Sequence, residues 1–139
     1  MGYRSDVRIM TSKKGFEELR KYTENYLAGK NWKGGNLLDD LDVDKETTIA
    51  KFMGWNQIKW YTDWEEYYAD VMAIEKGLDY LEDKQYSYRF ARIGENNDDY
   101  EERYFDGEND ENYDLEYPSM IREFDDEYVK EQMDYDATN

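Results

Sequence analysis

The chain has 139 residues and a formal net charge of −17, and it contains neither cysteine nor histidine. Disulfide bonds, thiolate metal sites, imidazole-ligated metal enzymes and nucleophiles activated by histidine are therefore excluded. The charge also disfavours direct binding to nucleic acid or to an anionic membrane, because both are themselves negative. A basic protein is the natural partner, and basic proteins in cells are mostly nucleic-acid binders.

We expect a single domain over residues 1–139, because a chain of this length forms one core. Residues 95–139 are an acidic C-terminal subregion within it. Hydrophobic residues make up 39% of the chain and aromatic residues 17%, so the rings must supply much of the packing. No apolar run approaches the roughly 18 residues of a membrane span, and the first residues lack the apolar stretch of a signal peptide.

The first half of the chain predicts strands around one helix. Val7 and Ile9 alternate with polar residues, which is typical of a strand. Ser12 is suited to cap a helix, apolar residues then recur at helical spacing, and Gly29 is suited to end it. The expected elements are a strand over 5–11, a helix from Ser12 to Gly29, a loop over 31–44, and strands over 47–53 and 58–60 around a turn at 54–56.

The second half begins with the most clearly amphipathic segment. Asp63 opens a capping-box-like sequence, and apolar residues from Trp64 to Leu81 then lie on one helical face, so we expect a helix that ends near Asp83. The elements expected after it are a strand over 86–93, a turn over 95–99, a strand over 100–105, an acidic loop from 106, a strand over 115–124 and a short final helix from 125.

This order predicts an α+β fold. The sheet is antiparallel or mixed, two main helices lie on one face, and an acidic C-terminal hairpin extends it. A ferredoxin-like plan with an added hairpin is one arrangement that satisfies the order.

The negative charge is concentrated after Gly94. Residues 95–139 hold 18 acidic and 3 basic residues, a net charge of −15. That exceeds the roughly 2–8 net charges that keep a small domain soluble, and interleaved aromatic rings favour a folded anionic surface over a solvating tail. Two interpretations remain open: a surface that imitates the phosphate backbone of DNA, or one that only solubilises the protein.

If this surface binds a partner, carboxylates supply the charge and tyrosines anchor it. The candidate partner-binding residues are Glu95, Asp98, Asp99, Glu101, Glu102, Asp106, Glu108, Asp110, Glu111, Asp114 and Glu116, together with Tyr100, Tyr104 and Tyr113.

Other patterns do not predict a cofactor, a metal site or a catalytic residue. Asp40, Asp42 and Asp44 open like an EF-hand loop, but Lys45 stands at its sixth position and Lys51 at its twelfth. The segment from Asp106 to Asp110 fails in the same way. Carboxylate pairs at catalytic distance are expected by chance among 35 acidic residues. We therefore expect a protein that is not an enzyme.

Two short stretches resemble bacteriophage proteins. The opening MGYRSDV is similar to the start of many small phage proteins. The sequence GWNQ at 54–57, followed by DWEEYYAD at 63–70 and Met72, resembles small acidic type II-A anti-CRISPR proteins. The resemblance implies an inhibitor that places carboxylates in the basic cleft where a CRISPR nuclease reads its PAM duplex. It implies a secondary acidic patch of Asp63, Glu65, Glu66 and Asp70, while Trp64 stands where that family has an acid.

The leading hypothesis is a non-enzymatic phage-type inhibitor in the host bacterial cytoplasm. Its acidic surface would block a basic nucleic-acid-binding protein of the host, such as a CRISPR nuclease or a restriction enzyme, without touching nucleic acid or membrane. One alternative is a small protein-binding phage module with a merely solubilising acidic surface. Another is a sequestering binder of a small anionic signalling molecule, with candidate contacts at Arg4, Arg8, Arg20, Arg89 and Arg92.

Overall fold

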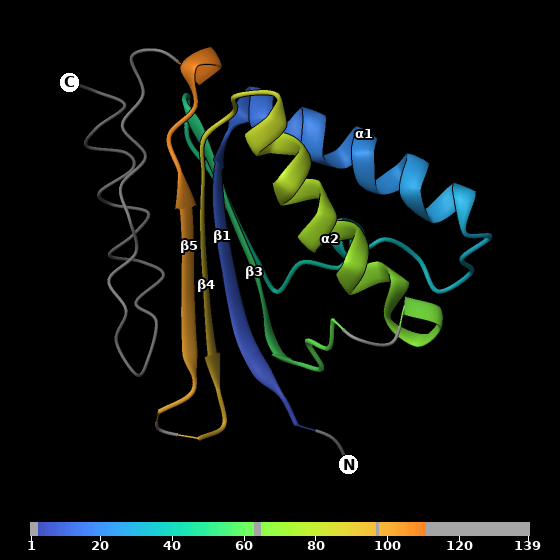
Figure 1. Ribbon diagram of the computed structural model, residues 1–139. Helices are drawn as coiled ribbons and strands as arrows, with labels where there is room; N and C mark the ends of the chain where they lie inside the picture. The colour runs from blue at the N-terminus through green and yellow to red at the C-terminus, as the bar shows by residue number, and fades with distance from the viewer. Residues whose placement is uncertain (1–2, 63–64, 97, 111–139) are drawn as a thin grey trace.

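The computed structural model describes residues 3–62, 65–96 and 98–110, without the side chains of Glu65 and Asp110. Figure 1 shows the arrangement of its helices and strands. The elements are β1 (Ser5–Ser12), α1 (Lys13–Gly29), the 3₁₀ turn η1 (Leu37–Asp39), β2 (Val43–Glu46), β3 (Ala50–Ile58), α2 (Glu65–Asp83), β4 (Tyr88–Gly94), β5 (Tyr100–Phe105) and the 3₁₀ turn η2 (Glu108–Asp110).

The five strands form one antiparallel sheet in the order β2-β3-β1-β4-β5. Both helices lie on the same face of it (Figure 1). The first four strands and the two helices follow the connectivity of a split βαβ, or ferredoxin-like, arrangement, and β5 extends the sheet beside β4. The expected α+β class, with two helices on one face of the sheet, is confirmed.

Local sequence explains where α1 begins and how it meets α2. The hydroxyl of Ser12 accepts a hydrogen bond of 2.9 Å from the backbone N–H of Gly15, as a helix N-cap does. Leu19 is fully buried on the inner side of α1. It lies against Gly77 of α2, where a Cβ atom would overlap the leucine side chain, so the two helices approach closely.

The helix α2 changes direction close to its start. Tyr68 has non-helical angles, φ −129° and ψ 37°, so the first residues of α2 point away from the axis of the rest. The ring of Tyr68 packs edge-on against that of Tyr61, with centroids 4.9 Å apart. None of the helices in the described part of the chain is long and apolar enough to cross a membrane.

The main core lies between the sheet and the two helices. Val7 and Ile9 of β1 point toward the helices, and their neighbours in β3 and β4 share that face. Aromatic rings fill much of the layer, as the composition predicts: Trp55 and Trp60 have ring centroids 5.5 Å apart. The other fully buried members include Leu19, Met53, Val71, Ile74, Leu78, Leu81, Tyr88 and Phe90.

The predicted break at residues 54–56 is wrong. β3 continues through Gly54, and the chain reverses earlier, between β2 and β3, within the range predicted as a strand over 47–53. Gly54 does not form a turn. It lets the backbones of β3 and β1 approach closely, because an added Cβ would overlap the carbonyl oxygen of Val7 in the neighbouring strand. The predicted loop over 31–44 was likewise too long, since it contains η1 and the start of β2.

The separate strand predicted over 58–60 is also wrong, since β3 ends at Ile58, but the remaining predicted elements in the described residues agree with the structure to within a few residues. The helix predicted up to Asp83 is α2, although Asp63 and Trp64 lie outside the described residues. The predicted hairpin after Gln85 is formed by β4 and β5. The strand predicted over 115–124 and the final helix from 125 also lie outside the described residues.

Arg103 of β5 connects the added strand to α2. Its guanidinium donates to Glu75 and Asp79 at 2.8 Å each and lies 3.5 Å from Glu82. Glu75 also accepts from the indole N–H of Trp60 at 2.8 Å, and its side chain is only 18% exposed. Burial raises the pKa of Glu75, while the hydrogen bond from Trp60 and the charge of Arg103 oppose that rise.

We predict that Arg103→Met lowers the free energy of unfolding by about 1–3 kcal/mol at pH 7, because a half-buried carboxylate loses its cation. The pKa of Glu75 is already above its unfolded value, and removing Arg103 raises it further. A raised carboxyl pKa costs stability as the pH rises above the unfolded value, so the loss shrinks as the pH falls to about 4, where Glu75 is mostly protonated in both states.

Denaturant unfolding at both pH values measures this effect. Arg20→Met is the matched control, since the Arg20–Asp39 pair lies at the surface and its loss is expected to cost at most about 1 kcal/mol. Equal losses for the two variants, or a loss at pH 4 as large as that at pH 7, would contradict the prediction.

Candidate functional site

The strand predicted over 100–105 exists as β5, but its charged side chains alternate between the two faces of the sheet. Glu101 and Arg103 pair with Arg92 and Phe90 on the side of the helices. Glu102, Tyr100 and Tyr104 point to the opposite, helix-free side. Both tyrosines are exposed, at 58% and 68%. The hairpin therefore does not display a uniform row of carboxylates on either face.

Arginines of β4 hold several of the predicted carboxylates. The guanidinium of Arg92 donates to Asp99 at 2.7 Å and to Glu101 at 2.6 Å. Asp99 also accepts from the hydroxyl of Tyr3, and these two hydrogen bonds lower the pKa of Asp99. The same carboxylates raise the pKa of Arg92, so this group stays charged. Asp99 and Glu101 thus stabilise the hairpin and contribute little net charge to its surface.

The remaining hairpin acids divide into paired and unpaired groups. Asp106 accepts from the guanidinium of Arg89 at 2.5 Å, and Glu95 accepts from the backbone N–H of Arg4 at 3.0 Å. Asp98 and Glu102 are exposed and form no ion pair with any described residue. Glu108 is exposed in η2. The side chain of Asp110, and Glu111, Tyr113, Asp114 and Glu116, lie outside the described residues.

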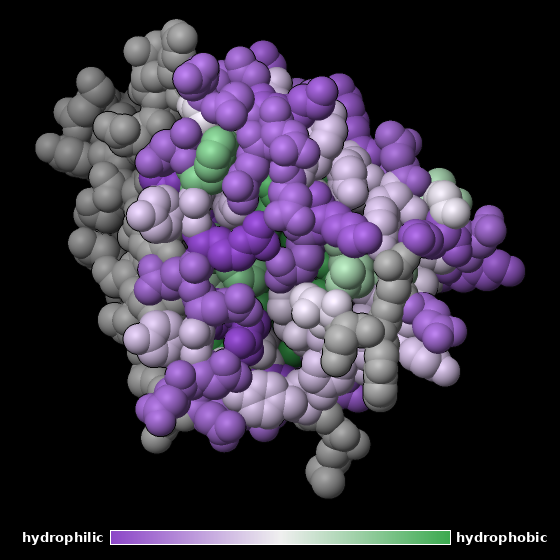
Figure 2. Space-filling model, viewed as in Figure 1, coloured by the Kyte–Doolittle hydropathy of each residue, from purple (hydrophilic) through white to green (hydrophobic). Residues whose placement is uncertain are grey.

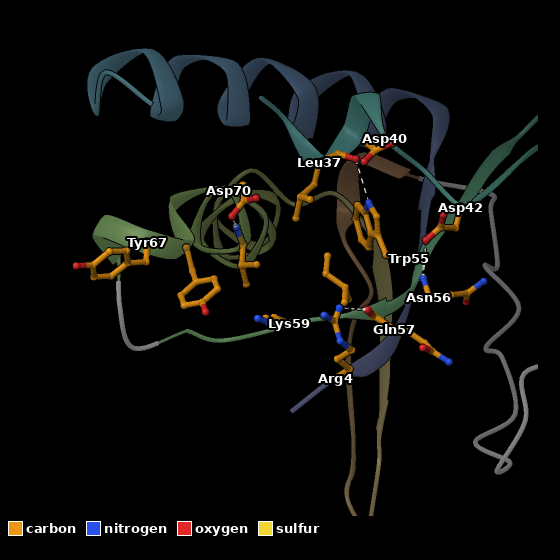
Figure 3. A pocket seen from close by; sticks show the side chains of 13 residues that line it. Arg4, Leu37, Asp40, Asp42, Trp55, Asn56, Gln57, Lys59, Tyr67 and Asp70 are labelled. Atoms are coloured by element: carbon orange, nitrogen blue, oxygen red, sulfur yellow. Dashed lines mark hydrogen bonds between the residues drawn. The ribbon is translucent and has the colours of Figure 1, made fainter. Parts of the chain in front are cut away.

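A second acidic surface lies where β3 ends and α2 begins. An open groove of about 500 Å³ runs there between the end of β3, the loop after η1 and the first turns of α2. Figure 3 shows its lining, which includes Asp40, Asp42, Trp55, Gln57, Tyr67 and Asp70. The GWNQ sequence and the first part of α2, the two segments of the phage-protein resemblance, therefore meet at one groove.

A β-bulge shapes the wall of this groove. Ser5 pairs with Ile58 and Val7 with Trp55, so that Asp6 faces both Asn56 and Gln57. The carboxylate of Asp6 accepts from the backbone N–H of Gln57 at 2.9 Å. Gln57 has a left-handed conformation, φ 52°, and the guanidinium of Arg4 donates to its carbonyl oxygen at 2.9 Å. These bonds fix a strained residue at the rim.

The other GWNQ residues are held as firmly. The indole N–H of Trp55 donates to the carbonyl oxygen of Leu37 at 3.0 Å, which ties η1 to the sheet (Figure 3). The carboxylate of Asp42 accepts from the backbone N–H of Asn56 at 2.8 Å. The side-chain oxygen of Asn56 in turn accepts from Arg8 at 2.7 Å. The groove is therefore built from hydrogen-bonded backbone rather than from loose loops.

The groove is acidic on balance. Asp40, Asp42 and Asp70 line it against two cations, Arg4 and Lys59. Partial burial raises the pKa of Asp70, although that carboxylate accepts from the backbone N–H of Val71 at 2.9 Å. Of the secondary acidic patch, Glu66 is exposed in α2, whereas Asp63 and the side chain of Glu65 lie outside the described residues.

Tyr67 is the most exposed aromatic side chain near this groove, at 68%. A tyrosine surrounded by carboxylates can bury its ring against a partner and keep its hydroxyl hydrogen-bonded. Figure 2 shows that the side on which α2 and β5 meet is mostly hydrophilic, with apolar colour limited to small spots. A partner on this side would thus meet a polar and charged surface with few apolar anchors.

The arginines proposed to bind a small anion are engaged within the protein. Arg92 and Arg89 hold carboxylates, and Arg20 donates to Asp39 at 2.8 Å. Arg8 is 4% exposed and bonded to Asn56. Arg4 reaches both the groove and a smaller hollow of about 230 Å³. Neither of these two hollows is lined by Arg89 or Arg92.

The aspartates of the EF-hand-like sequence do not converge. Asp40 and Asp42 face the groove, whereas Asp44 lies in β2 and pairs with Lys51. Within the described ranges, no group of three or more carboxylates is arranged to hold a metal ion. From the sequence, Asp40 and Asp42 were candidates only as calcium ligands, and Asn56, Gln57 and Tyr67 were not proposed as site residues. Asn56, Gln57 and Tyr67 lie within the two stretches that resemble anti-CRISPR proteins, and that position was the signal that could have identified them.

No protein-family model matches the chain, and neither a curated protein nor a solved structure matches it significantly.

We predict that Gly54→Ala destabilises the protein by about 1–3 kcal/mol, because the new methyl group would overlap the carbonyl oxygen of Val7 and lie 2.6 Å from Cδ of Arg8. Without such a clash, alanine would make the strand more stable than glycine does, because glycine loses more conformational entropy on folding. Gly29→Ala is the control: an added Cβ there has no neighbour within 4 Å. The control is expected to be neutral or to gain up to about 1 kcal/mol in thermal or denaturant unfolding.

Proposed function

We propose that this protein is a non-enzymatic, phage-type inhibitor that acts in the cytoplasm of a bacterial host. Its acidic surface occupies the nucleic-acid site of a basic host protein, a CRISPR nuclease or a restriction enzyme. One observation carries the proposal: Gly54–Gln57 and the first turns of α2, which resemble segments of anti-CRISPR proteins, lie together at a groove lined by carboxylates.

The groove, rather than the hairpin, is the primary contact in this proposal. Asp99, Glu101 and Asp106 are neutralised by Arg92 and Arg89, and so they present little net charge to a partner. Asp40 lines the groove, is exposed and forms no ion pair with described residues, whereas Glu66 lines a separate pocket together with Lys30 and Lys33. Asp40, with Asp42 and Asp70, can replace phosphates at a basic surface. Exposed Asp98 and Glu102 add to the field that attracts it.

Rigidity supports an inhibitory role. A competitor of DNA gains affinity if its charges are already placed, because ordering side chains on binding costs free energy. The bulge at Asn56–Gln57 is held by Arg4 and Asp6, and Asp42 is fixed to the backbone of Asn56. Tyr67 supplies an aromatic anchor next to these charges. The proposed activity is steric and electrostatic, and so it needs no catalytic group.

Affinity capture from a bacterial lysate, with the bound proteins identified, tests the proposal. We expect a basic nucleic-acid-binding protein to be retained at low salt and released at about 0.5 M salt, where screening limits charge interactions to a few ångströms. Added duplex DNA should displace it as well. Capture that resists both salt and DNA would favour the protein-binding module with a solubilising acidic surface.

Charge reversal locates the contact. We predict that Asp40→Lys weakens binding of the captured protein by about tenfold or more, roughly 1.4 kcal/mol, because like charges then face each other. Glu17→Lys makes the same change in net charge at an exposed helical position that does not line the groove. Equal weakening by both variants would show that only overall charge matters, and would count against the groove.

A further inference from the structure

A second pocket, of about 560 Å³, lies between the chain that follows α1 and the first turns of α2. Its lining consists of Lys30, Asn31, Trp32 and Lys33 from the first segment and of Glu66 and Ala69 from α2. It shares no lining residue with the groove described above. Its volume falls in the range of roughly 300–1,000 Å³ that is typical of small-molecule sites.

Trp32 gives this pocket a fixed aromatic wall. Its ring packs against a small core cluster that includes Leu27 and Ala69. The indole N–H donates to the carbonyl oxygen of Gly35 at 2.9 Å. Gly34 lies so close that an added Cβ would be 2.7 Å from the ring. The ring is therefore held in place, and with its N–H already engaged it offers the pocket an apolar aromatic surface.

Positive charge is concentrated at this end of α1, although the chain as a whole is strongly acidic. Lys30 and Lys33 are exposed, and Lys33 forms no ion pair with a described residue. The ammonium group of Lys30 lies 5.5 Å from the ring centroid of Tyr26, and that of Lys76 lies 5.6 Å from the same centroid. Three lysines thus create a local field that attracts a small anion.

The other polar groups of the pocket limit the kind of anion. Asn31 has a left-handed conformation, φ 54°, and its side-chain amide makes no hydrogen bond to a described residue. Such an amide can donate to and accept from the edge of a nucleobase. Glu66 is exposed and forms no ion pair with a described residue. A carboxylate in an otherwise basic pocket suits the hydroxyl groups of a ribose, which donate hydrogen bonds.

The overall charge favours a single nucleotide over a nucleic-acid strand. A polyanion would extend beyond the lysines and meet the field of a chain with net charge −17. One phosphate group carries about two negative charges, which the ammonium groups beside the pocket can compensate.

We propose that this pocket binds a nucleoside monophosphate, with the phosphate at Lys30 and Lys33, the base on Trp32 and the ribose hydroxyls toward Glu66. Asn31 contacts the edge of the base. This binding activity is independent of the proposed inhibitory function, because none of these residues lines the groove.

Titration of the full-length protein with AMP, GMP, CMP and UMP, followed by calorimetry and by amide chemical shifts, tests the proposal. The corresponding nucleosides and inorganic phosphate are titrated separately. Because the phosphate and the ring have separate contacts, we expect at least one nucleotide to bind tenfold or more tightly than its nucleoside or phosphate alone. The shifts should be largest at residues 30–33, 66 and 69.

Two variants with a matched control locate the site. Lys33→Gln is expected to weaken nucleotide binding fivefold or more, whereas Lys21→Gln, at an exposed position on α1 outside the pocket, should leave it unchanged. Asn31→Gly keeps the left-handed backbone accessible and should reduce the preference among the four bases.

Four results would overturn the proposal: no binding of any of the four nucleotides, phosphate alone binding as tightly as a nucleotide, equal weakening by both lysine variants, or shifts centred on other residues.

Discussion

The charge compensation at Arg103 is the interaction on which the acidic side of the molecule depends. β5 and the outer surface of α2 are both rich in carboxylates, and without a cation between them they would repel each other. Arg103 reaches Glu75 and Asp79 of α2, and Glu75 in turn holds the indole of Trp60. A strand of the added hairpin, the second helix and an aromatic of the core are thus joined through one guanidinium.

Charge compensation by arginines also lowers the number of carboxylates that can act as free surface charges. A net charge of −17 suggests carboxylates that all face outward, but arginines of β4 and β5 hold several of them within the fold. Those carboxylates stabilise the hairpin, and the described acids that form no ion pair include Asp40 at the groove, Asp98 in the turn and Glu102 on β5. The proposed inhibitory surface is consequently smaller and more local than the count of acids implies. Its position follows from the bulge at Asn56–Gln57 rather than from the composition.

The sequence predicted the elements whose signals are local. The apolar spacing of both helices, the Ser12 cap and the alternation in β1, β4 and β5 all gave the right type of element. Gly54 was misread because a glycine that permits close strand contact looks, in sequence, like one that permits a turn. The groove was not predictable in this way, since it requires the register that sets Asn56 and Gln57 opposite Asp6. Ion pairs such as Arg92 with Asp99 depend on the same register.

The outermost described strands share one further property. β2 has the sequence VDKE and β5 the sequence YEERYF, so both margins of the sheet carry three consecutive charged side chains. A strand from another molecule that paired with either margin would bring its own chain against these charges and desolvate them. These charges therefore protect the described edges of the sheet against edge-to-edge pairing and growth into extended sheets.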